Sequence, residues 1–182
     1  MKTRVPVLMA VLGASVAMLL VVGCAAAILS VRDDPDDVSA CQDSVRAGEA
    51  KVRTDRWNPP QEMPGLGDYP EIHWQVRALG NPCTRAPGPT DWVYQGVVRL
   101  RSEDARRLAE RYEFVPYASA DPGGLPYSGS PADAWPALVP FLPPQPRWLH
   151  SRSYNEGSPS TRWRVAFLDV EQRTLFFMLR DH

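Results

Sequence analysis

The longest uninterrupted apolar stretch of the sequence lies near its N-terminus. Residues 5–31 contain no charged side chain. A helix of this length spans roughly 40 Å, which exceeds the ~30 Å hydrocarbon core of a bilayer. The pattern therefore predicts one membrane-spanning helix that contacts the membrane through residues 5–31. It divides the chain into a membrane anchor, residues 1–32, and one further domain, residues 33–182.

Beyond the anchor, apolar residues recur with the spacings that are typical of strands and helices. Alternating or densely apolar runs predict strands at residues 72–78, 92–101, 147–154, 163–170 and 174–180. Apolar residues three and four positions apart predict two helices, at residues 34–49 and 102–112. Runs of strands without alternating helices favour an α+β fold, with a mainly antiparallel sheet of about five strands packed by one or two helices.

The first predicted strand and the last two differ in how their polar residues are placed. In residues 72–78, His73, Gln75 and Arg77 alternate with apolar residues, so one face is expected to be buried and the other to face solvent. Residues 163–180 are apolar on both faces, which predicts a hairpin at the centre of the sheet. One face of this hairpin is expected under helix 102–112. The other is expected under the first helix or a proline-rich stretch.

That proline-rich stretch separates the second helix from the last three strands. Nine of the 31 residues from 116 to 146 are proline, yet the stretch also holds large apolar residues that need burial, such as Trp135 and Phe141. We expect a long ordered loop with one helical turn around residues 134–139. Long loops inside compact domains often carry function. Trp57 and Trp135 lie in proline-rich loops and are therefore candidate ligand-binding residues.

The charges that flank the apolar run predict how the chain crosses the membrane. Lys2 and Arg4 precede the run, and several aspartates follow it. The N-terminus is therefore expected in the cytoplasm and the domain outside, in a single-pass protein of the cell membrane. All basic residues except Lys2 and Lys51 are arginine. This bias is typical of a GC-rich bacterial genome, so the membrane is expected to belong to a bacterial cell envelope.

The apolar run has three alternative fates. An uncleaved anchor is favoured, because the apolar cores of signal peptides are usually only about 7–15 residues long. Alternatively, residues 21–24 (VVGC) resemble the lipobox of bacterial lipoproteins, which would place a lipid on Cys24. The third alternative is cleavage after Ala27, which would release the domain.

Two cysteines lie in the domain beyond the apolar run. An even number of cysteines outside the cell favours a disulfide, here between Cys41 and Cys83. Neither cysteine has a C-x-x-C partner or a neighbouring histidine. No metal site is therefore expected.

No catalytic motif stands out in the sequence. Any domain of this size offers a loose hydrolytic set, here His150 with Ser128, Ser151 or Ser153 and an acid such as Asp121. A G-x-S-x-G elbow and a glycine-rich phosphate loop are both missing from the sequence. The net charge of −1 and the lack of a basic stripe argue against a nucleic-acid partner. We expect no enzyme and no cofactor.

Two functional hypotheses remain. The leading one is a binding or interaction module of the cell envelope, with an unidentified ligand or protein partner. Its candidate ligand-binding residues are Trp57, Trp135, His73 and His150. The alternative is an envelope hydrolase whose residues are scattered in the sequence. A pocket shared by His73 and His150 with an acid and a nucleophile would favour the hydrolase, whereas a groove lined by aromatic residues would favour binding.

Overall fold

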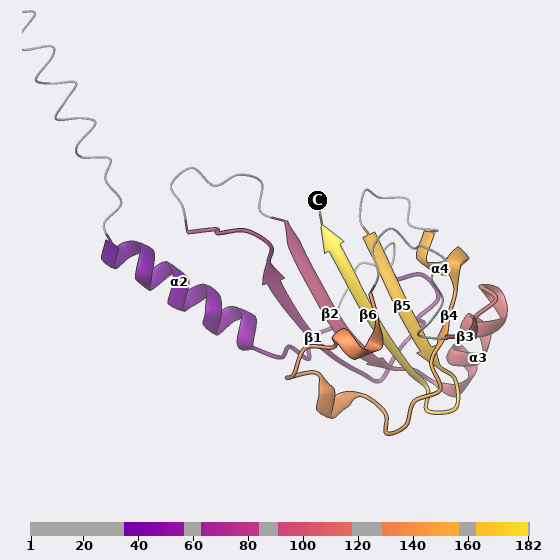
Figure 1. Cartoon of the computed structure of the whole chain (residues 1–182). Coiled ribbons are helices and arrows are strands. Elements are labelled where there is room, and N and C mark those ends of the chain that lie inside the picture. Colours follow the sequence, from indigo (N-terminus) through magenta and orange to yellow (C-terminus); the bar gives the residue numbers. More distant parts are fainter. Residues whose placement is uncertain (1–34, 57–62, 84–90, 118–128, 157–162, 182) are drawn as a thin grey trace, which may run out of the picture. The chain divides into compact units, whose positions relative to one another are not determined.

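A computed structural model describes most of the chain beyond the predicted anchor. It covers residues 35–56, 63–83, 91–117, 129–156 and 163–181 (Figure 1). The predicted anchor, Cys24 and Trp57 lie outside these ranges. Among the helices of these ranges, none is both long and apolar enough to cross a membrane. The chain divides into two compact units, Met1–Ala40 and Cys41–His182. The described part of the first unit is the start of helix α2 (Pro35–Ala50).

A six-stranded antiparallel sheet forms the centre of the second unit (Figure 1). Its strands are β1 (Glu71–Ala78), β2 (Trp92–Arg99), β3 (Val115–Pro116), β4 (Leu149–His150), β5 (Trp163–Asp169) and β6 (Thr174–Asp181). Their spatial order is β1-β2-β6-β5-β4-β3, and all neighbours are antiparallel. The α+β fold is confirmed. The β5–β6 hairpin lies inside the sheet, as its two apolar faces predict.

Three helices accompany the sheet within the described ranges: α2, α3 (Ser102–Arg111) and α4 (Arg152–Glu156). The predicted helices at residues 34–49 and 102–112 correspond to α2 and α3. The strand predicted at residues 147–154 is wrong beyond His150, because a helix begins there. The backbone N–H of Tyr154 donates to Ser151 Oγ at 3.1 Å, so Ser151 caps the first turn of α4.

The helical turn predicted at residues 134–139 is also displaced. Two short 3₁₀ helices lie on either side of that position, η1 (Pro131–Asp133) and η2 (Val139–Phe141). Each has a proline in its first turn. Proline is favoured there because its fixed φ suits a helix start and its missing N–H would have no partner inside the helix.

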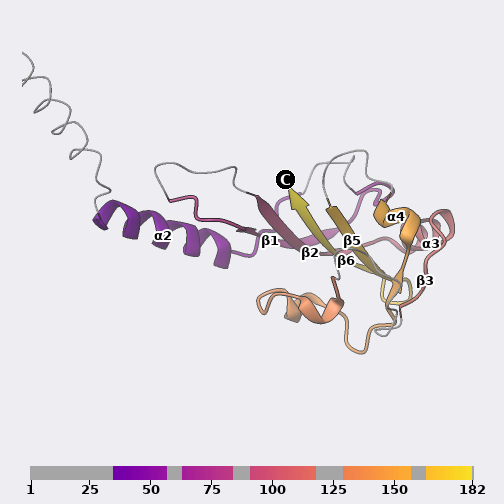
Figure 2. The ribbon, with the colours of Figure 1, turned by 45° about the horizontal axis from the view of Figure 1, so that its top comes forward.

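Two apolar clusters, one on each face of the sheet, form the core of the second unit. One cluster joins Phe177 to Ala105 and Leu108 of α3. The other joins Phe167 and Phe176 to residues of the proline-rich stretch, which lies beneath the sheet in Figure 2. Successive side chains of a strand point to opposite faces, so the hairpin fills both clusters. This confirms the expectation that helix 102–112 covers one face of the hairpin and the proline-rich stretch the other.

The predicted disulfide between Cys41 and Cys83 is present, with Cα atoms 5.7 Å apart. A second attachment lies at the end of α2. The Nε2 of Gln75 donates to the carbonyl oxygens of Glu49 at 2.9 Å and Ala50 at 3.2 Å. The last carbonyl groups of a helix have no partner inside it, so this buried amide satisfies them. Hydrogen bonds therefore hold the C-terminal end of α2 to strand β1, and the disulfide holds Cys41 of the same helix to the segment that follows β1.

Candidate functional site

The polar face of β1 is covered, although the alternation of its residues predicts exposure to solvent. His73 stacks on Phe141 with ring centroids 3.6 Å apart. The guanidinium of Arg77 lies 4.1 Å from the ring centroid of Trp135. Both aromatic residues belong to the segment of residues 129–148, which we call the proline-rich cover. His73 and Arg77 of this face are thus contacts of the cover, whereas Gln75 binds the end of α2.

Gln95 of β2 fixes the first half of the cover to the sheet. Its side chain is only 4 % exposed. The Nε2 donates to the carbonyl oxygen of Asp133 at 3.1 Å, and the Oε1 accepts from the N–H of Trp135 at 2.9 Å. One amide thereby satisfies an acceptor and a donor of backbone that lies outside the strands.

The second half of the cover is attached near the β5–β6 turn. Gln172 Nε2 donates to the carbonyl oxygen of Pro144 at 2.8 Å. The backbone N–H of Arg147 donates to Asp169 Oδ2 at 2.8 Å. Hydrogen bonds therefore attach both halves of the cover to the sheet and the β5–β6 turn, which keeps the surface of the cover ordered.

We expect Gln95→Ala to loosen the first half of the cover. Leaving a buried hydrogen-bonding group without its partner costs about 1–3 kcal/mol. Amide hydrogen exchange at Trp135 should therefore accelerate by at least about tenfold. Exchange in β6 should stay unchanged. The matched control is Gln172→Ala, which removes a bond at the other end and should leave Trp135 protected. An equal loss of protection throughout the sheet would contradict a local role.

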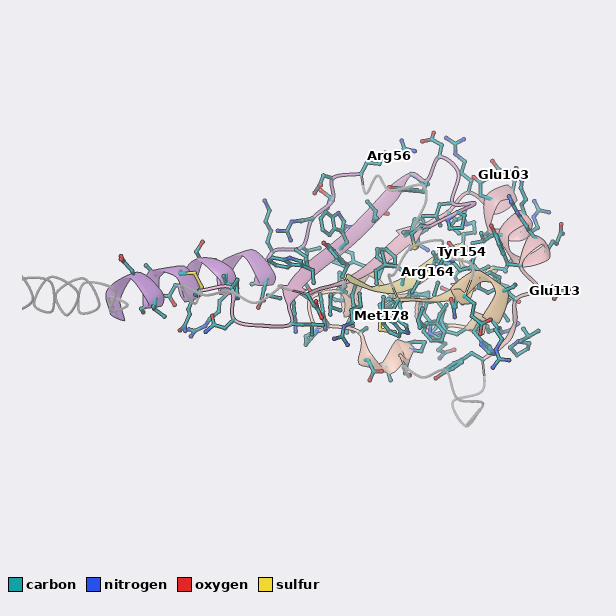
Figure 3. The ribbon with its side chains drawn as sticks, turned by 90° about the horizontal axis from the view of Figure 1, so that it is seen from above. Arg56, Glu103, Glu113, Tyr154, Arg164 and Met178 are labelled. Atoms are coloured by element: carbon teal, nitrogen blue, oxygen red, sulfur yellow. A yellow bond between two sulfur atoms is a disulfide. The ribbon has the colours of Figure 1, made fainter. Side chains whose placement is uncertain are left out.

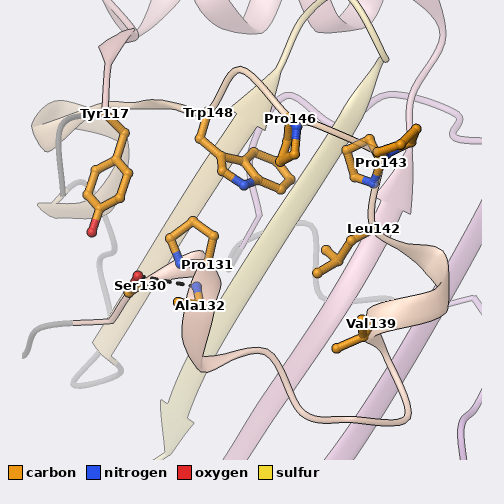
Figure 4. Close-up of a pocket in the computed structure, with 10 residues that line it drawn as sticks. Tyr117, Ser130, Pro131, Ala132, Val139, Leu142, Pro143, Pro146 and Trp148 are labelled. Carbon is orange, nitrogen blue, oxygen red and sulfur yellow. Dashed lines mark hydrogen bonds between the residues drawn. The ribbon is translucent and has the colours of Figure 1, made fainter.

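The cover and Tyr117 form an open apolar groove of about 580 Å³ (Figure 4). Ligand sites in proteins are commonly concave and mostly apolar, with volumes in this range. The lining comprises two aromatic residues, four prolines and four smaller residues: Tyr117, Trp148, Pro131, Pro143, Pro144, Pro146, Ser130, Ala132, Val139 and Leu142. Val139 is 52 % exposed and lies within this mainly apolar lining.

The two aromatic residues of the groove are braced on the core. The ring of Tyr117 lies edge-on to Phe167 with centroids 4.9 Å apart, and its backbone N–H donates to the carbonyl oxygen of Trp148 at 2.9 Å. The ring of Trp148 lies 6.5 Å from that of Phe176. Their positions are therefore fixed by the central hairpin before any ligand binds.

The opposite wall of the groove is a closed turn. Ser130 N–H donates to Asp133 Oδ2 at 2.9 Å, and Ala132 N–H donates to Ser130 Oγ at 3.2 Å (Figure 4). This reciprocal capping holds η1 and engages the hydroxyl of Ser130. The groove thus presents mainly apolar surface, with few polar groups left for a ligand.

A smaller, more polar hollow of about 280 Å³ lies beside the groove. Residues 142–144 line both hollows. The sheet contributes Glu71, His73, Val97 and Arg99 to the polar hollow, and Phe141 is among its contacts from the cover. It therefore adds charged and aromatic groups next to an apolar groove.

The two histidines do not form one site. Directly opposed residues of neighbouring strands share a face, and one such row consists of His73, Val97, Phe176, Phe167 and His150. Four strand spacings of about 4.8 Å separate its ends by roughly 19 Å. His73 lines the polar hollow, whereas His150 packs behind Tyr117 with ring centroids 5.8 Å apart. The shared pocket that would favour a hydrolase is not formed.

The other candidates for hydrolysis have structural contacts or lie outside the described residues. The hydroxyls of Ser151 and Ser153 both donate to the carbonyl oxygen of Tyr112. Ser128 and Asp121 lie outside the described ranges. Within those ranges, no three His, Cys, Asp or Glu side chains gather into a set that could hold a metal ion.

A buried cation lies on the other face of the sheet. Arg164 is 3 % exposed, its guanidinium lies 4.5 Å from the ring centroid of Tyr154, and it donates to the carbonyl oxygen of that residue (Figure 3). Burial raises the pKa of the Tyr154 hydroxyl and lowers the pKa of Arg164. Shifted pKa values can mark active sites, but Tyr154 is fully enclosed in the core cluster with α3. We interpret this pair as part of the core.

Comparisons of the chain with models of protein families, with curated proteins and with solved structures gave no match. The functional argument therefore depends on the site itself. Of the candidates from the sequence, His73 lies in the polar hollow and Trp135 packs on Arg77. The groove aromatics Tyr117 and Trp148 were missed. Their sequence signal is their place at the two ends of the proline-rich stretch, since Tyr117 follows its first proline and Trp148 lies two residues after its last.

Proposed function

We propose that the second unit is a binding module and that its ligand site is the apolar groove formed by Tyr117 and the proline-rich cover, which includes Trp148. The observation that carries the proposal is an open hollow of about 580 Å³ whose aromatic residues are braced on the core. Side chains that are fixed before binding lose little conformational entropy on binding, which favours affinity.

The ligand that suits this groove is an extended polypeptide segment with prolyl or aliphatic side chains. A carbohydrate would need many hydrogen-bonding side chains, whereas Ser130 is engaged in its own turn and most of the other lining residues are apolar. Grooves lined by aromatic residues bind proline-rich segments, because such segments already adopt the extended polyproline II conformation.

We further propose that this module stands outside a bacterial cell on an anchor formed by residues 5–31. Two observations support this location. Basic residues precede the apolar run and aspartates follow it. The disulfide between Cys41 and Cys83 is a bond that persists in oxidising compartments and is rare in the cytosol.

The groove proposal predicts that Trp148→Ala abolishes most peptide binding. The probe is the peptide PPLPPL with acetylated and amidated ends, added to the ¹⁵N-labelled full chain in lipid nanodiscs. Amide signals should shift at Tyr117 and around residues 130–132 and 139–148. Truncating an aromatic anchor should weaken binding at least about thirtyfold.

The matched control is Trp92→Ala, a tryptophan at the start of β2 that does not line the groove. It should leave the affinity for the peptide unchanged. Unchanged affinity in Trp148→Ala, or signal shifts confined to the α3 side of the sheet, would refute the groove as the site. Binding of chitotriose at the groove without binding of the peptide would assign the site to carbohydrate instead.

A further inference from the structure

We infer that the polar hollow beside the groove is an anion subsite, in which Arg99 binds an acidic side chain of the same polypeptide ligand. The inference rests on the proposed function of the groove. The two hollows share Leu142, Pro143 and Pro144 as a common wall. One extended polypeptide segment can therefore contact both sides of this wall.

Arg99 has a fixed position and unused donors. Its Nη1 donates to the carbonyl oxygen of Gln172 at 2.8 Å and to Thr174 Oγ1 at 3.1 Å. Both acceptors are neutral, so they orient the guanidinium without cancelling its charge. Its Nε and Nη2 have no acceptor in the described part of the chain. These two nitrogens lie along one edge of the guanidinium, the geometry that binds a carboxylate through two parallel hydrogen bonds.

One of the two residues paired with Arg99 across the strands is acidic. Glu71 lies directly opposite Arg99 in the register of β1 and β2. Even so, the described residues show no ion pair between the two side chains. Instead, Glu71 Oε1 lies 3.6 Å from Nε2 of His73, whose ring is held against Phe141. The carboxylate of Glu71 is more than half exposed, so solvent screens its effect. Arg99 is therefore the available cation of the hollow, and Glu71 is the anion that a ligand carboxylate must approach.

The experiment compares matched peptides that differ in one residue. The probes are PPLPPE and PPLPPQ, both with acetylated and amidated ends, titrated into the full chain in lipid nanodiscs by calorimetry. The glutamate peptide should bind at least about tenfold more tightly, because hydrogen bonds to charged groups are stronger than neutral ones. Raising the salt concentration should reduce this preference, because the subsite is open to solvent.

Two variants assign the preference to the subsite. Arg99→Gln should bind both peptides with the affinity that the wild type shows for PPLPPQ. Glu71→Gln removes an exposed like charge, is not expected to disturb folding, and should increase the preference for PPLPPE by about threefold. If Arg99→Gln fails to fold, the Glu71→Gln variant decides alone. A preference for PPLPPE that does not increase in this variant would overturn the inference.

The outcomes separate the subsite from the groove. Equal affinity of the wild type for both peptides, with signals shifting at Trp148, would overturn the subsite and leave the groove in place. Failure of both peptides to bind would overturn the groove and the subsite together. A third probe, PPLPPQ with a free C-terminal carboxylate, tests the source of the anion. If this probe binds more tightly than PPLPPE, Arg99 binds the C-terminal carboxylate of a ligand. That result would overturn the inference that it binds an acidic side chain.

Discussion

Phe177→Ala is expected to lose about 3–5 kcal/mol of unfolding free energy, the typical cost of truncating a buried aromatic residue. Phe177 is 1 % exposed and packs in the core cluster that joins β6 to α3. Its ring occupies the space above Gly96, where an added Cβ would lie only 2.4 Å from Phe177 Cζ. The neighbouring strand has no side chain there to fill the cavity, so little relaxation is available.

This loss is a large part of the roughly 5–15 kcal/mol that stabilises a domain of this size. Urea denaturation of the full chain, followed by tryptophan fluorescence, should therefore show a much lower midpoint for Phe177→Ala. Val139→Ala, an exposed position in the groove, is the control and should change the midpoint little. A near-neutral Phe177→Ala would mean that this face of the hairpin is not a core.

The position of this hairpin is the part of the fold that the sequence predicts best. Strands that are apolar on both faces must be covered on both faces, so residues 163–180 had to be central. The same argument locates α3, because a helix with one apolar stripe packs that stripe on a sheet. These features depend on burial alone, and burial is what the pattern of apolar residues reports.

The polar face of β1 shows where that pattern stops being informative. Alternation separates apolar from polar residues, but it does not tell whether a polar residue meets water or another part of the chain. His73, Gln75 and Arg77 face aromatic rings of the cover and the end of α2. The burial needed by Trp135 and Phe141 was predictable from their size. Their contacts were not, because they depend on tertiary pairing.

The groove was beyond sequence reasoning for a related reason. Tyr117 and Trp148 lie at opposite ends of the proline-rich stretch and are joined by one backbone hydrogen bond. Such a pairing has no local signature. Helix α4 was missed because Trp148 and Tyr154 favour strands, while the signal for the helix is the single cap Ser151.

Reduction of the disulfide is expected to destabilise the second unit by about 4 kcal/mol. The bond joins cysteines 42 positions apart, and the chain-entropy model gives this value for closing a loop of that length in the unfolded state. The native contacts of the helix end should survive, because the amide of Gln75 still binds the carbonyl oxygens of Glu49 and Ala50. Reduction should therefore lower the unfolding midpoint while the contacts of the folded state stay in place.

The measurement is the unfolding midpoint of the full chain with and without reductant, together with the double variant Cys41→Ser/Cys83→Ser. Reductant should lower the midpoint of the wild type to that of the double variant and leave the double variant unchanged. Cys24→Ser, which leaves the disulfide intact, should respond to reductant as the wild type does. Two alkylatable thiols at Cys41 and Cys83 in the oxidised protein would show that the bond does not form. Without that bond, the proposal that this module stands outside the cell would lose one of its two supports and rest on the flanking charges alone.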